Sequence, residues 1–217
     1  MSVTILLPTY NEEENISLMI DRIHTVSSDF EILVVDSNST DQTIPLAKKK
    51  GAKTVIIEKR GKGLAVGIAL KDVESDYLIV MDSDLTYPAD AIPTILEKLK
   101  TYDVVLGSRF KGSVEKGAMT PVNKIGNLFL TTLATLMYQK SVSDVCTGMW
   151  GFTKKAYKQI LVDAPHFELE VNFFVEAVKR NLKICELPID YKKRGGKSKL
   201  SIKHGFDIAL YLVKKRF

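Results

Sequence analysis

The chain has 217 residues, which is enough for one domain with a substantial core. Its hydrophobic fraction of 45% and charged fraction of 26% are those of an ordinary globular protein. They exclude collagen-like, disordered and disulfide-stapled classes. The two cysteines, Cys146 and Cys185, lack Cys-x-x-Cys spacing and fit buried thiols in a reducing compartment.

The net charge of +5 is concentrated at the carboxyl end of the chain. Residues 190–217 hold nine Lys or Arg against two Asp, whereas residues 1–189 hold 22 basic and 24 acidic side chains. Nucleic-acid binding usually spreads Lys and Arg along a face with aromatic residues between them. The body is slightly acidic, so we expect no nucleic-acid partner and a phosphate or membrane partner for the basic segment.

The first half of the chain alternates strand-like and helix-like segments. Short apolar runs rich in Val and Ile predict buried strands at Val3–Pro8, Glu31–Asp36, Ala52–Glu58, Tyr77–Asp82 and Asp103–Gly107. Amphipathic patterns predict helices at Glu12–Val26, Asp41–Lys50, Gly63–Val73 and Asp90–Lys100, with Asp41 and Asp90 as N-caps. This alternation predicts an α/β domain with a mostly parallel central sheet and helices on both faces.

After Gly107 the alternation ends. The segments that follow are a glycine-rich loop (Lys111–Gly117), a helix (Lys124–Tyr138), a loop (Asp144–Gly151), helices Lys154–Leu161 and Glu170–Asn181, a strand (Lys183–Tyr191), a basic loop and a final helix. No repeat or clear linker divides the chain, so we predict a single domain over residues 1–217. No run of about 18 apolar residues occurs, so we expect no membrane-spanning helix in this sequence.

Polar residues follow four of the predicted strands. They are Pro8-Thr9-Tyr10-Asn11-Glu12, Asp36-Ser37-Asn38-Ser39, Asp82-Ser83-Asp84 and Gly107-Ser108-Arg109. Ligands of open parallel sheets bind beyond the carboxyl ends of the strands. A single polar strand end is commonly only a turn or a cap, but four on one edge indicate a binding site.

The Asp82-Ser83-Asp84 segment is the sharpest of these signals. Two carboxylates so close together repel each other unless a cation lies between them. Oxygen ligands suit Mg²⁺ or Mn²⁺, which often bridge to the phosphates of a substrate. The alternative is a solvated turn before Pro88.

Two further segments combine glycine with basic residues. Gly61-Lys62-Gly63 could bring backbone and a cation close to a phosphate or a base, and residues 192–199 (KKRGGKSK) could fold over an anionic ligand. Each could equally be a solvated loop. The last helix carries Lys214, Lys215 and Arg216 beside apolar residues at helical spacing, so it can lie on an anionic membrane or pack on the domain.

Taken together, these motifs resemble the family-2 glycosyltransferases of GT-A fold. The second half narrows the resemblance, because residues 144–152 (DVCTGMWGF), 167–170 (FELE) and 194–200 (RGGKSKL) are similar to the polyprenyl-phosphate (dolichyl-phosphate) mannose or glucose synthases. The resemblance covers nearly the whole chain. It implies a nucleotide-sugar-binding half (1–110), an acceptor-binding half (111–200) and an amphipathic, membrane-interface helix (201–217).

The resemblance also implies roles for individual residues. Nucleotide-sugar binding is implied for Pro8, Tyr10, Glu12, Asp36, Ser37, Lys62, Asp82, Ser83 and Asp84, with Asp82 and Asp84 holding Mg²⁺ or Mn²⁺ on the diphosphate. Acceptor-phosphate binding is implied for Arg109, Lys124, Asn127, Arg194 and Lys199. Asp84, Arg109 and Arg194 are the expected catalytic residues.

The expected reaction is inverting, metal-dependent transfer of a hexose to a polyprenyl phosphate. We expect mannose from GDP-mannose; a UDP-glucose donor, or transfer to a sugar hydroxyl, is the alternative. An acceptor phosphate is already an anionic nucleophile, so the reaction needs no strong general base. Transfer to a hydroxyl would need one, and Glu168 and Glu170 are the candidates. The enzyme would work at the cytoplasmic face of a membrane.

Three positions depart from the family's pattern. Ser37 stands where many relatives have a second acidic residue, and Thr86 stands where a glutamine is often found after the metal motif. Asn123 stands where an arginine is common, which leaves Lys124 as the cation of that loop.

Overall fold

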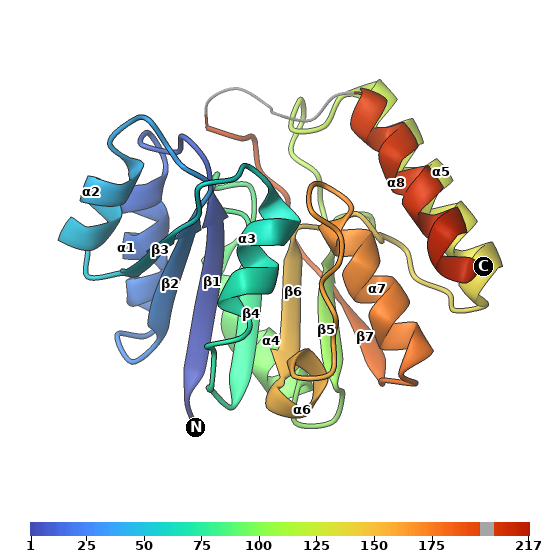
Figure 1. The fold of residues 1–217 in the computed structure, drawn as a ribbon, viewed down its shortest axis with the longest axis horizontal. Helices are drawn as coiled ribbons and strands as arrows, with labels where there is room; N and C mark the ends of the chain where they lie inside the picture. The colour runs from blue at the N-terminus through green and yellow to red at the C-terminus, as the bar shows by residue number, and fades with distance from the viewer. Residues whose placement is uncertain (196–201) are drawn as a thin grey trace.

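The computed structural model describes residues 1–195 and 202–217, which form one seven-stranded sheet with helices on both faces (Figure 1). The strands, in chain order, are β1 (Val3–Thr9), β2 (Glu31–Asp36), β3 (Lys53–Ile56), β4 (Tyr77–Met81), β5 (Val104–Ser108), β6 (Met149–Thr153) and β7 (Ile184–Pro188). Their order across the sheet is β3-β2-β1-β4-β6-β5-β7. Strand β6 is antiparallel to β4 and β5, and the other neighbouring pairs of this sheet are parallel.

The helices cover the sheet in two layers, each with its own core. They are α1 (Ile16–Val26), α2 (Thr43–Lys49), α3 (Lys62–Ala69), α4 (Ile92–Lys98), α5 (Pro121–Tyr138), α6 (Lys154–Tyr157), α7 (Leu169–Lys179) and α8 (Ile202–Arg216), with a short 3₁₀ turn, η1 (Ala89–Ala91). Helices α1 and α4 pack on one face with strand residues such as Ile5 and Ile79. Helices α3, α5, α7 and α8 cover the other face, around Leu6 and Trp150. Alternate residues of each strand thus serve opposite cores.

The predicted strands and helices of the first half are confirmed, with ends that move by a few residues. Helix α1 begins at Ile16 rather than at Glu12, after a turn in which Asn11 has a positive φ of 49°. The predicted N-cap Asp90 is wrong, because this residue lies inside the 3₁₀ turn η1. Asp41 precedes the N-cap position by one residue, and its carboxylate accepts a hydrogen bond from the backbone of Thr43 at 3.0 Å.

Strand β6 begins inside the segment predicted as a loop (Asp144–Gly151) and continues to Thr153. Its five residues are nearly all buried, because β6 lies between β4 and β5 with helices on both sides. A strand buried on both faces has no polar–apolar alternation to reveal it. Gly151 faces α4, and a β-carbon there would lie 2.3 Å from Ile95. This close approach explains a glycine in the middle of a strand.

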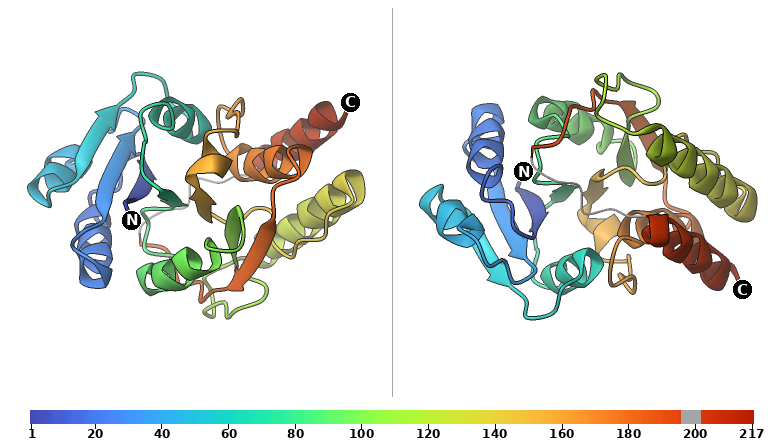
Figure 2. Two further views of the ribbon diagram at one scale, coloured as in Figure 1. Left: turned by 90° about the horizontal axis from the view of Figure 1, so that it is seen from below. Right: turned by 90° about the horizontal axis from the view of Figure 1, so that it is seen from above.

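Helices α5 and α8 pack side by side at one end of the molecule (Figures 1 and 2). Helix α8 is attached to the domain through its buried residues Ile208 and Leu212, and the carbonyl of Leu212 accepts a hydrogen bond from the Tyr138 hydroxyl at 3.0 Å. The Tyr211 hydroxyl also donates to Asp163 at 2.6 Å. The final helix therefore packs on the domain.

Both helices nevertheless keep an apolar side exposed. The exposed apolar residues are Val122, Ile125, Leu128, Phe129 and Leu136 on α5, and Phe206, Leu210, Val213 and Phe217 at the end of α8. On α8 they recur at intervals of four, three and four residues, which places them on one side of the helix. Within residues 1–195 and 202–217, no helix is both long and apolar enough to cross a bilayer.

Candidate active site

The carboxyl ends of β1, β2 and β4 place their polar residues at one edge of the sheet. These strands are parallel neighbours, so the segments that follow Thr9, Asp36 and Met81 emerge on the same side. Ser83 links two of these segments, because its hydroxyl donates to the carbonyl of Pro8 at 3.3 Å. For these three of the four predicted strand ends, the gathering at one edge is confirmed.

The carboxylate of Asp82 is paired with a partly buried lysine. The Nζ atom of Lys62, at the start of α3, lies 2.5 Å from Oδ1 of Asp82 and also forms an ion pair with Glu170 in the first turn of α7. On its other side, Asp82 contacts the backbone of Gly148, where a β-carbon would lie 2.3 Å from Oδ2. Asp82 is thus confined between a cation and a glycine backbone.

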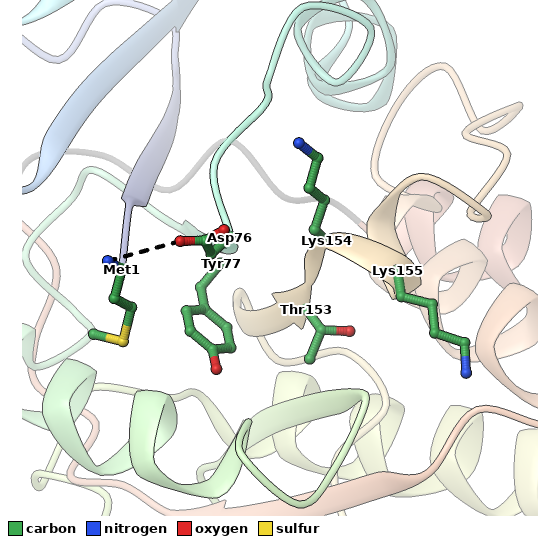
Figure 3. Close-up of a pocket in the computed structure, with 6 residues that line it drawn as sticks. All are labelled: Met1, Asp76, Tyr77, Thr153, Lys154 and Lys155. Carbon is green, nitrogen blue, oxygen red and sulfur yellow. Dashed lines mark ion pairs between the residues drawn. The ribbon is translucent and has the colours of Figure 1, made fainter.

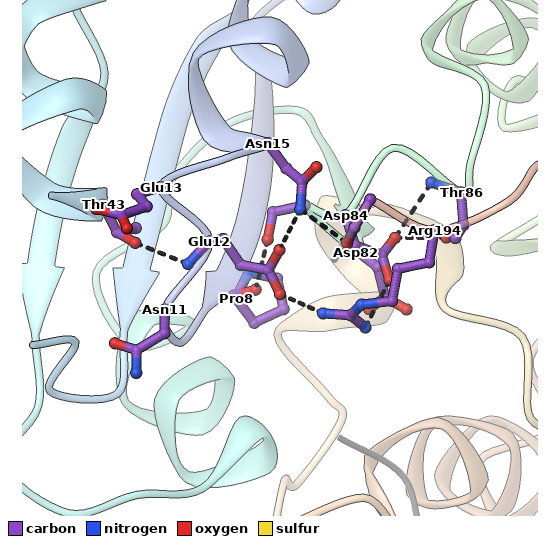
Figure 4. A network of polar contacts seen from close by, with 12 residues as sticks. Pro8, Asn11, Glu12, Glu13, Asn15, Thr43, Asp82, Asp84, Thr86 and Arg194 are labelled. Atoms are coloured by element: carbon purple, nitrogen blue, oxygen red, sulfur yellow. Dashed lines mark hydrogen bonds and ion pairs between the residues drawn. The ribbon is translucent and has the colours of Figure 1, made fainter. Parts of the chain in front are cut away.

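The carboxylate of Asp84 is held by the basic segment from the far end of the chain (Figure 4). Arg194 donates to Oδ2 of Asp84 at 2.8 Å and to the carboxylate of Glu12. Thr86, the departure from the family's pattern, donates from its backbone at 3.1 Å and from its hydroxyl at 2.5 Å to Oδ1 of Asp84. Asn15 donates to Glu12 at 2.7 Å and to the carbonyl of Gly195 at 3.1 Å.

Burial shifts the acid–base properties of this cluster. Burial, and next the charge of Asp82, raise the pKa of Asp84 above its usual range, although Arg194 and Thr86 oppose the change. Burial also raises the pKa of Glu170, against the opposing charge of Lys62. Burial alone would lower the pKa of Lys62, but Asp82 and Glu170 outweigh it and raise that pKa. Burial thus favours the neutral forms of Asp84 and Glu170, and the neighbouring cations oppose this effect.

The expected nucleotide-binding residues on β1 and β2 lie around a second cluster. The carboxylate of Asp36 is buried; it accepts hydrogen bonds from the backbone of Ser39 at 2.7 Å and from the Thr9 hydroxyl at 3.3 Å. The Ser37 hydroxyl donates to the carbonyl of Gly61 at 3.5 Å. Beside them, the guanidinium of Arg60 lies over the Tyr10 ring, 4.3 Å from its centre.

Among the described residues, no contact joins the expected acceptor-phosphate residues Arg109, Lys124, Asn127 and Arg194 to one another. Arg109 is buried, and its Nε and Nη2 atoms each donate to the carboxylate of Asp144 at 2.7 Å. On α5, Lys124 is exposed and Asn127 donates weakly to the sulfur of Met119 at 3.9 Å. The described contacts thus do not bring either α5 side chain to Asp82, Asp84 or Arg194. Lys199 lies outside the residues that the structure describes.

The glycines on either side of Lys62 serve chain packing. A β-carbon on Gly63 would lie 1.7 Å from the carbonyl oxygen of Ala164, and one on Gly61 would lie 2.3 Å from that of Pro165. The backbone of Gly63 also donates to the carbonyl of His166 at 3.2 Å. The two glycines therefore let the segment before α7 approach α3, which brings Lys62 to Glu170.

Sequence patterns alone missed several partners of the expected residues. Asn15 follows Glu12 by three residues, the spacing of neighbours on a helical turn, and this spacing is a local signal for their contact. Asp144 lies 35 residues from Arg109, and Glu170 lies 108 residues from Lys62. Contacts across such separations arise from the strand order and have no local pattern.

Comparison with known proteins identifies the family. The family model described as "Glycosyl transferase family 2" matches residues 4–161. The chain is 33% identical to glycosyltransferase AglJ of Haloferax volcanii over 89% of this chain and 64% of that protein. It is 31% identical to a dolichyl-phosphate hexose transferase of the same organism, over 91% of this chain and 86% of that protein. The chain belongs to glycosyl transferase family 2. It spans less than two thirds of the length of AglJ.

The fold of this family-2 chain is also found among solved structures. Glucosyl-3-phosphoglycerate synthase from Mycobacterium tuberculosis, solved with Mn²⁺, UDP-glucose and phosphoglyceric acid, superposes with a TM-score of 0.80 at 21% identity, over 99% of this chain and 79% of that one. The predicted GT-A fold, with its mostly parallel sheet, is confirmed. The family match includes Asp82, Asp84 and Arg109, whereas Glu170 and Arg194 lie beyond its last residue, 161.

The carboxylates of this family-2 site fit a divalent cation. Across the described part of the chain, no group of three or more His, Cys, Asp or Glu side chains surrounds a common metal position. Asp82 and Asp84 supply two oxygen ligands at a strand end, and each is paired with a side-chain cation, Lys62 or Arg194. A divalent cation with few protein ligands commonly takes its remaining ligands from water and substrate phosphates. The residues present therefore fit such an ion together with a diphosphate.

A hollow at the opposite end of the sheet, where β4 begins and β6 ends, is separate from this site (Figure 3). It has a volume of about 520 Å³ and is lined by Met1, Asp76, Tyr77, Thr153, Lys154 and Lys155. Tyr77 begins β4 and Thr153 ends β6, so the hollow lies at the edge away from Asp82. Lys154 is already paired with Glu74 at 2.9 Å, and the hollow shows no arrangement of catalytic groups.

Proposed function

We propose that this protein transfers a hexose, mannose from GDP-mannose, to a polyprenyl phosphate with inversion at the anomeric carbon. The observation that carries the proposal is the cluster of Asp82, Asp84, Glu12, Lys62 and Arg194, in which two strand-end carboxylates meet two cations. Such a cluster suits the binding of a metal-bound diphosphate. The relatives named as a glycosyltransferase and as a dolichyl-phosphate hexose transferase support the same class of reaction.

The chain's own residues supply binding, orientation and charge. Asp82 and Asp84 would hold Mg²⁺ or Mn²⁺, which neutralises the leaving diphosphate when bound. Asp36, with Ser39 and Thr9 fixing its carboxylate, would accept hydrogen bonds from the donor's nucleoside. Arg194 can exchange its contact with Asp84 for a phosphate oxygen, because guanidinium binds either anion in the same geometry.

The proposed acceptor is a lipid monophosphate, which attacks without losing a proton to a base. Of the two candidate bases, Glu170 has its carboxylate paired with Lys62, and Glu168 accepts a hydrogen bond from the backbone N–H of His166 at 3.1 Å. A transferase that acts on a sugar hydroxyl would need a carboxylate available to take the proton. Lys124 and Asn127, at the start of α5, would meet the acceptor phosphate as it approaches from the side of that helix.

We further propose that the enzyme works at the cytoplasmic face of a membrane, with α5 and α8 against the lipid. Phe129 on α5 and Phe206 on α8 are 60% and 73% exposed. The last turn of α8 carries Lys214, Lys215 and Arg216, which suits an anionic surface. A polyprenyl chain resides in the bilayer, so these apolar sides would place the site beside its acceptor.

The donor and the metal can be tested together by thermal shift. We expect GDP-mannose to raise the melting temperature of the wild-type protein in the presence of Mn²⁺ and to have little effect with EDTA. UDP-glucose, UDP and dTDP-sugars are the comparison ligands. Metal-dependent stabilisation by UDP-glucose alone would show that UDP-glucose, not GDP-mannose, is the donor. Stabilisation by no nucleotide sugar would overturn the proposal.

Transfer itself is measured with radiolabelled donor and a short polyprenyl phosphate. We expect Asp84→Ala to abolish the lipid-linked product at saturating Mn²⁺. Asp29→Ala, at an exposed carboxylate of the α1–β2 loop, is the matched control and should retain full activity. Undiminished transfer by Asp84→Ala would show that this carboxylate has no role with the metal.

A further inference from the structure

Lys62 is shared between two carboxylates that come from different parts of the fold. Its ammonium group lies 2.5 Å from Asp82, at the end of β4, and forms a second ion pair with Glu170, in the first turn of α7. The three side chains are 17%, 28% and 10% exposed, in the order Lys62, Asp82 and Glu170. Two negative charges and one positive charge leave this triad with a net charge of −1.

The pairing of Lys62 with Glu170 is built into the backbone, independently of Asp82. The α3 residues around Lys62 and the segment before α7 are joined by hydrogen bonds from Gly63 to His166 (3.2 Å) and from Leu64 to Pro165 (3.0 Å). Gly61 and Gly63 leave no room for a side chain between the two segments. Lys62 therefore retains Glu170 as a partner when another cation binds Asp82.

We propose that Glu170 is a positioning residue that keeps the charge of Lys62 from neutralising Asp82. With Glu170 present, Lys62 divides its charge between two carboxylates, and Asp82 keeps enough negative charge to bind a divalent cation. Without Glu170, Lys62 would pair with Asp82 alone and compete with the metal. This inference rests on the proposed metal-dependent function and adds a residue that lies outside the matched family region.

Two substitutions that break the same ion pair give opposite expectations. Glu170→Gln removes a negative charge from the triad, and we expect Mn²⁺ to bind about 10- to 100-fold more weakly, as when an outer partner of a metal ligand is removed. Lys62→Gln removes the competing cation, and we expect Mn²⁺ to bind at least as tightly as in the wild type. The double variant returns the net charge to −1 and should bind close to the wild-type affinity.

The measurement is the affinity for Mn²⁺ alone, from the electron paramagnetic resonance signal of the free ion, so no turnover is required. Glu176→Gln is the matched control, because Glu176 is a buried carboxylate of the same helix that pairs with Arg180. It should leave Mn²⁺ affinity unchanged. Urea unfolding of each variant shows whether it is folded; if Glu170→Gln is not, Glu170→Ala takes its place, with the same loss of Mn²⁺ affinity expected.

The outcomes separate this inference from the proposed function. Weaker binding by Glu170→Gln together with undiminished binding by Lys62→Gln supports the positioning role. Equal losses in both folded variants would show that the ion pair is only structural, and unchanged affinity in Glu170→Gln would also overturn the inference. No saturable Mn²⁺ binding by the wild type, with or without GDP, would overturn the metal-dependent function and this inference with it.

Discussion

At the scale of single residues, the site depends on charges that the fold buries in pairs. Arg109 and Asp144 illustrate this, since the carboxylate of Asp144 is fully buried and receives two side-chain hydrogen bonds and one backbone hydrogen bond from Arg109. A further contact runs from Arg109 to the carbonyl of Cys146 at 2.9 Å. The pair therefore joins the end of β5 to the loop before β6, next to the Asp82 site.

We expect Arg109→Met to destabilise the protein by about 3–5 kcal/mol, because it leaves the Asp144 carboxylate buried and unpaired. The free energy of unfolding in urea measures the effect. The double variant with Asp144→Asn should cost clearly less than the single one, since no buried charge then lacks a partner. A loss below about 1 kcal/mol in Arg109→Met would place the pair among solvent-screened surface contacts.

Asp84 gives a prediction about pH. Its pKa is raised by burial and next by Asp82, so the folded chain binds this proton more readily than the unfolded chain. Stability from this group is therefore lost as the pH rises from the ordinary carboxyl range through the raised pKa. We expect Asp84→Asn to raise the melting temperature of the metal-free protein near neutral pH, by about 2–4 °C for each kcal/mol gained.

The melting temperatures of the wild type and Asp84→Asn at low pH test whether the raised pKa of Asp84 is the cause. Near pH of about 4 or below, where the wild-type carboxyl is increasingly protonated, the advantage of Asp84→Asn should shrink. Asp29→Asn, at an exposed carboxylate, should not change the melting temperature at either pH. A stabilisation that is independent of pH would assign the effect to packing.

The sequence identified the residues of the candidate site better than it identified their partners. Asp84, Glu12 and Asp82 stand at strand ends, where a short apolar run followed by polar residues is a local signal. Asp84 and Glu12 lie 110 and 182 residues from Arg194, and Asp82 lies 20 residues from Lys62. Nothing local to the chain specifies which cation meets which carboxylate, because that depends on how α3, α7 and the segment after β7 dock.

At the scale of elements, the contact between α3 and the segment before α7 positions Lys62. Position 63 requires glycine because the two segments leave no room for a β-carbon. We expect Gly63→Ala to destabilise the protein by about 1–3 kcal/mol or more, because its β-carbon would overlap the carbonyl oxygen of Ala164. Displacement of Lys62 from Asp82 would also remove a competing cation, so Mn²⁺ binding should be at least as tight as in the wild type. Urea unfolding and Mn²⁺ titration measure the two effects.

Gly126→Ala provides the matched control within α5. A β-carbon at Gly126 would have no described neighbour within 4 Å. Alanine in the interior of a helix is favoured over glycine by about 0.5–1 kcal/mol, so this substitution should stabilise the protein. If the two substitutions changed the free energy of unfolding equally, the backbone around Gly63 would accommodate a β-carbon without loss of stability.

The elements themselves were largely predictable where their patterns are local. The βαβ units of the first half alternate short Val- and Ile-rich runs with amphipathic helices. Each strand and helix can therefore be recognised from its own residues. Strand β6 was missed because both of its faces are buried, and its place between β4 and β5 is set by tertiary packing. Helix α5 begins at Pro121, three residues before the predicted start, and its N-cap Thr120 accepts a hydrogen bond from the backbone N–H of Asn123 at 3.1 Å.

At the scale of the whole molecule, the exposed apolar residues lie largely on the α5–α8 end. We expect the wild-type protein to float with vesicles that contain anionic lipid, and the variant Phe206→Ser to partition about tenfold less, since a buried aromatic side chain contributes about 1.5–3 kcal/mol. Leu18→Ser, at an exposed position of α1, is the control and should float like the wild type. Equal flotation of both variants would show that Phe206 of α8 does not contribute to membrane binding.

The position of β6 also determines when a newly made chain can join β5 to β4. Strand β5 ends at Ser108, but the strand that joins it to β4 is not finished until Thr153. At about 5–20 residues per second, ribosomal synthesis of those 45 residues takes roughly 2–9 s. During that interval β4 and β5 each have an unpaired edge, and such edges attract other chains. The facing edges of β4 and β5 therefore stay open to pairing with other chains until β6 enters the sheet, and the outer edge of β5 stays open until β7 is made.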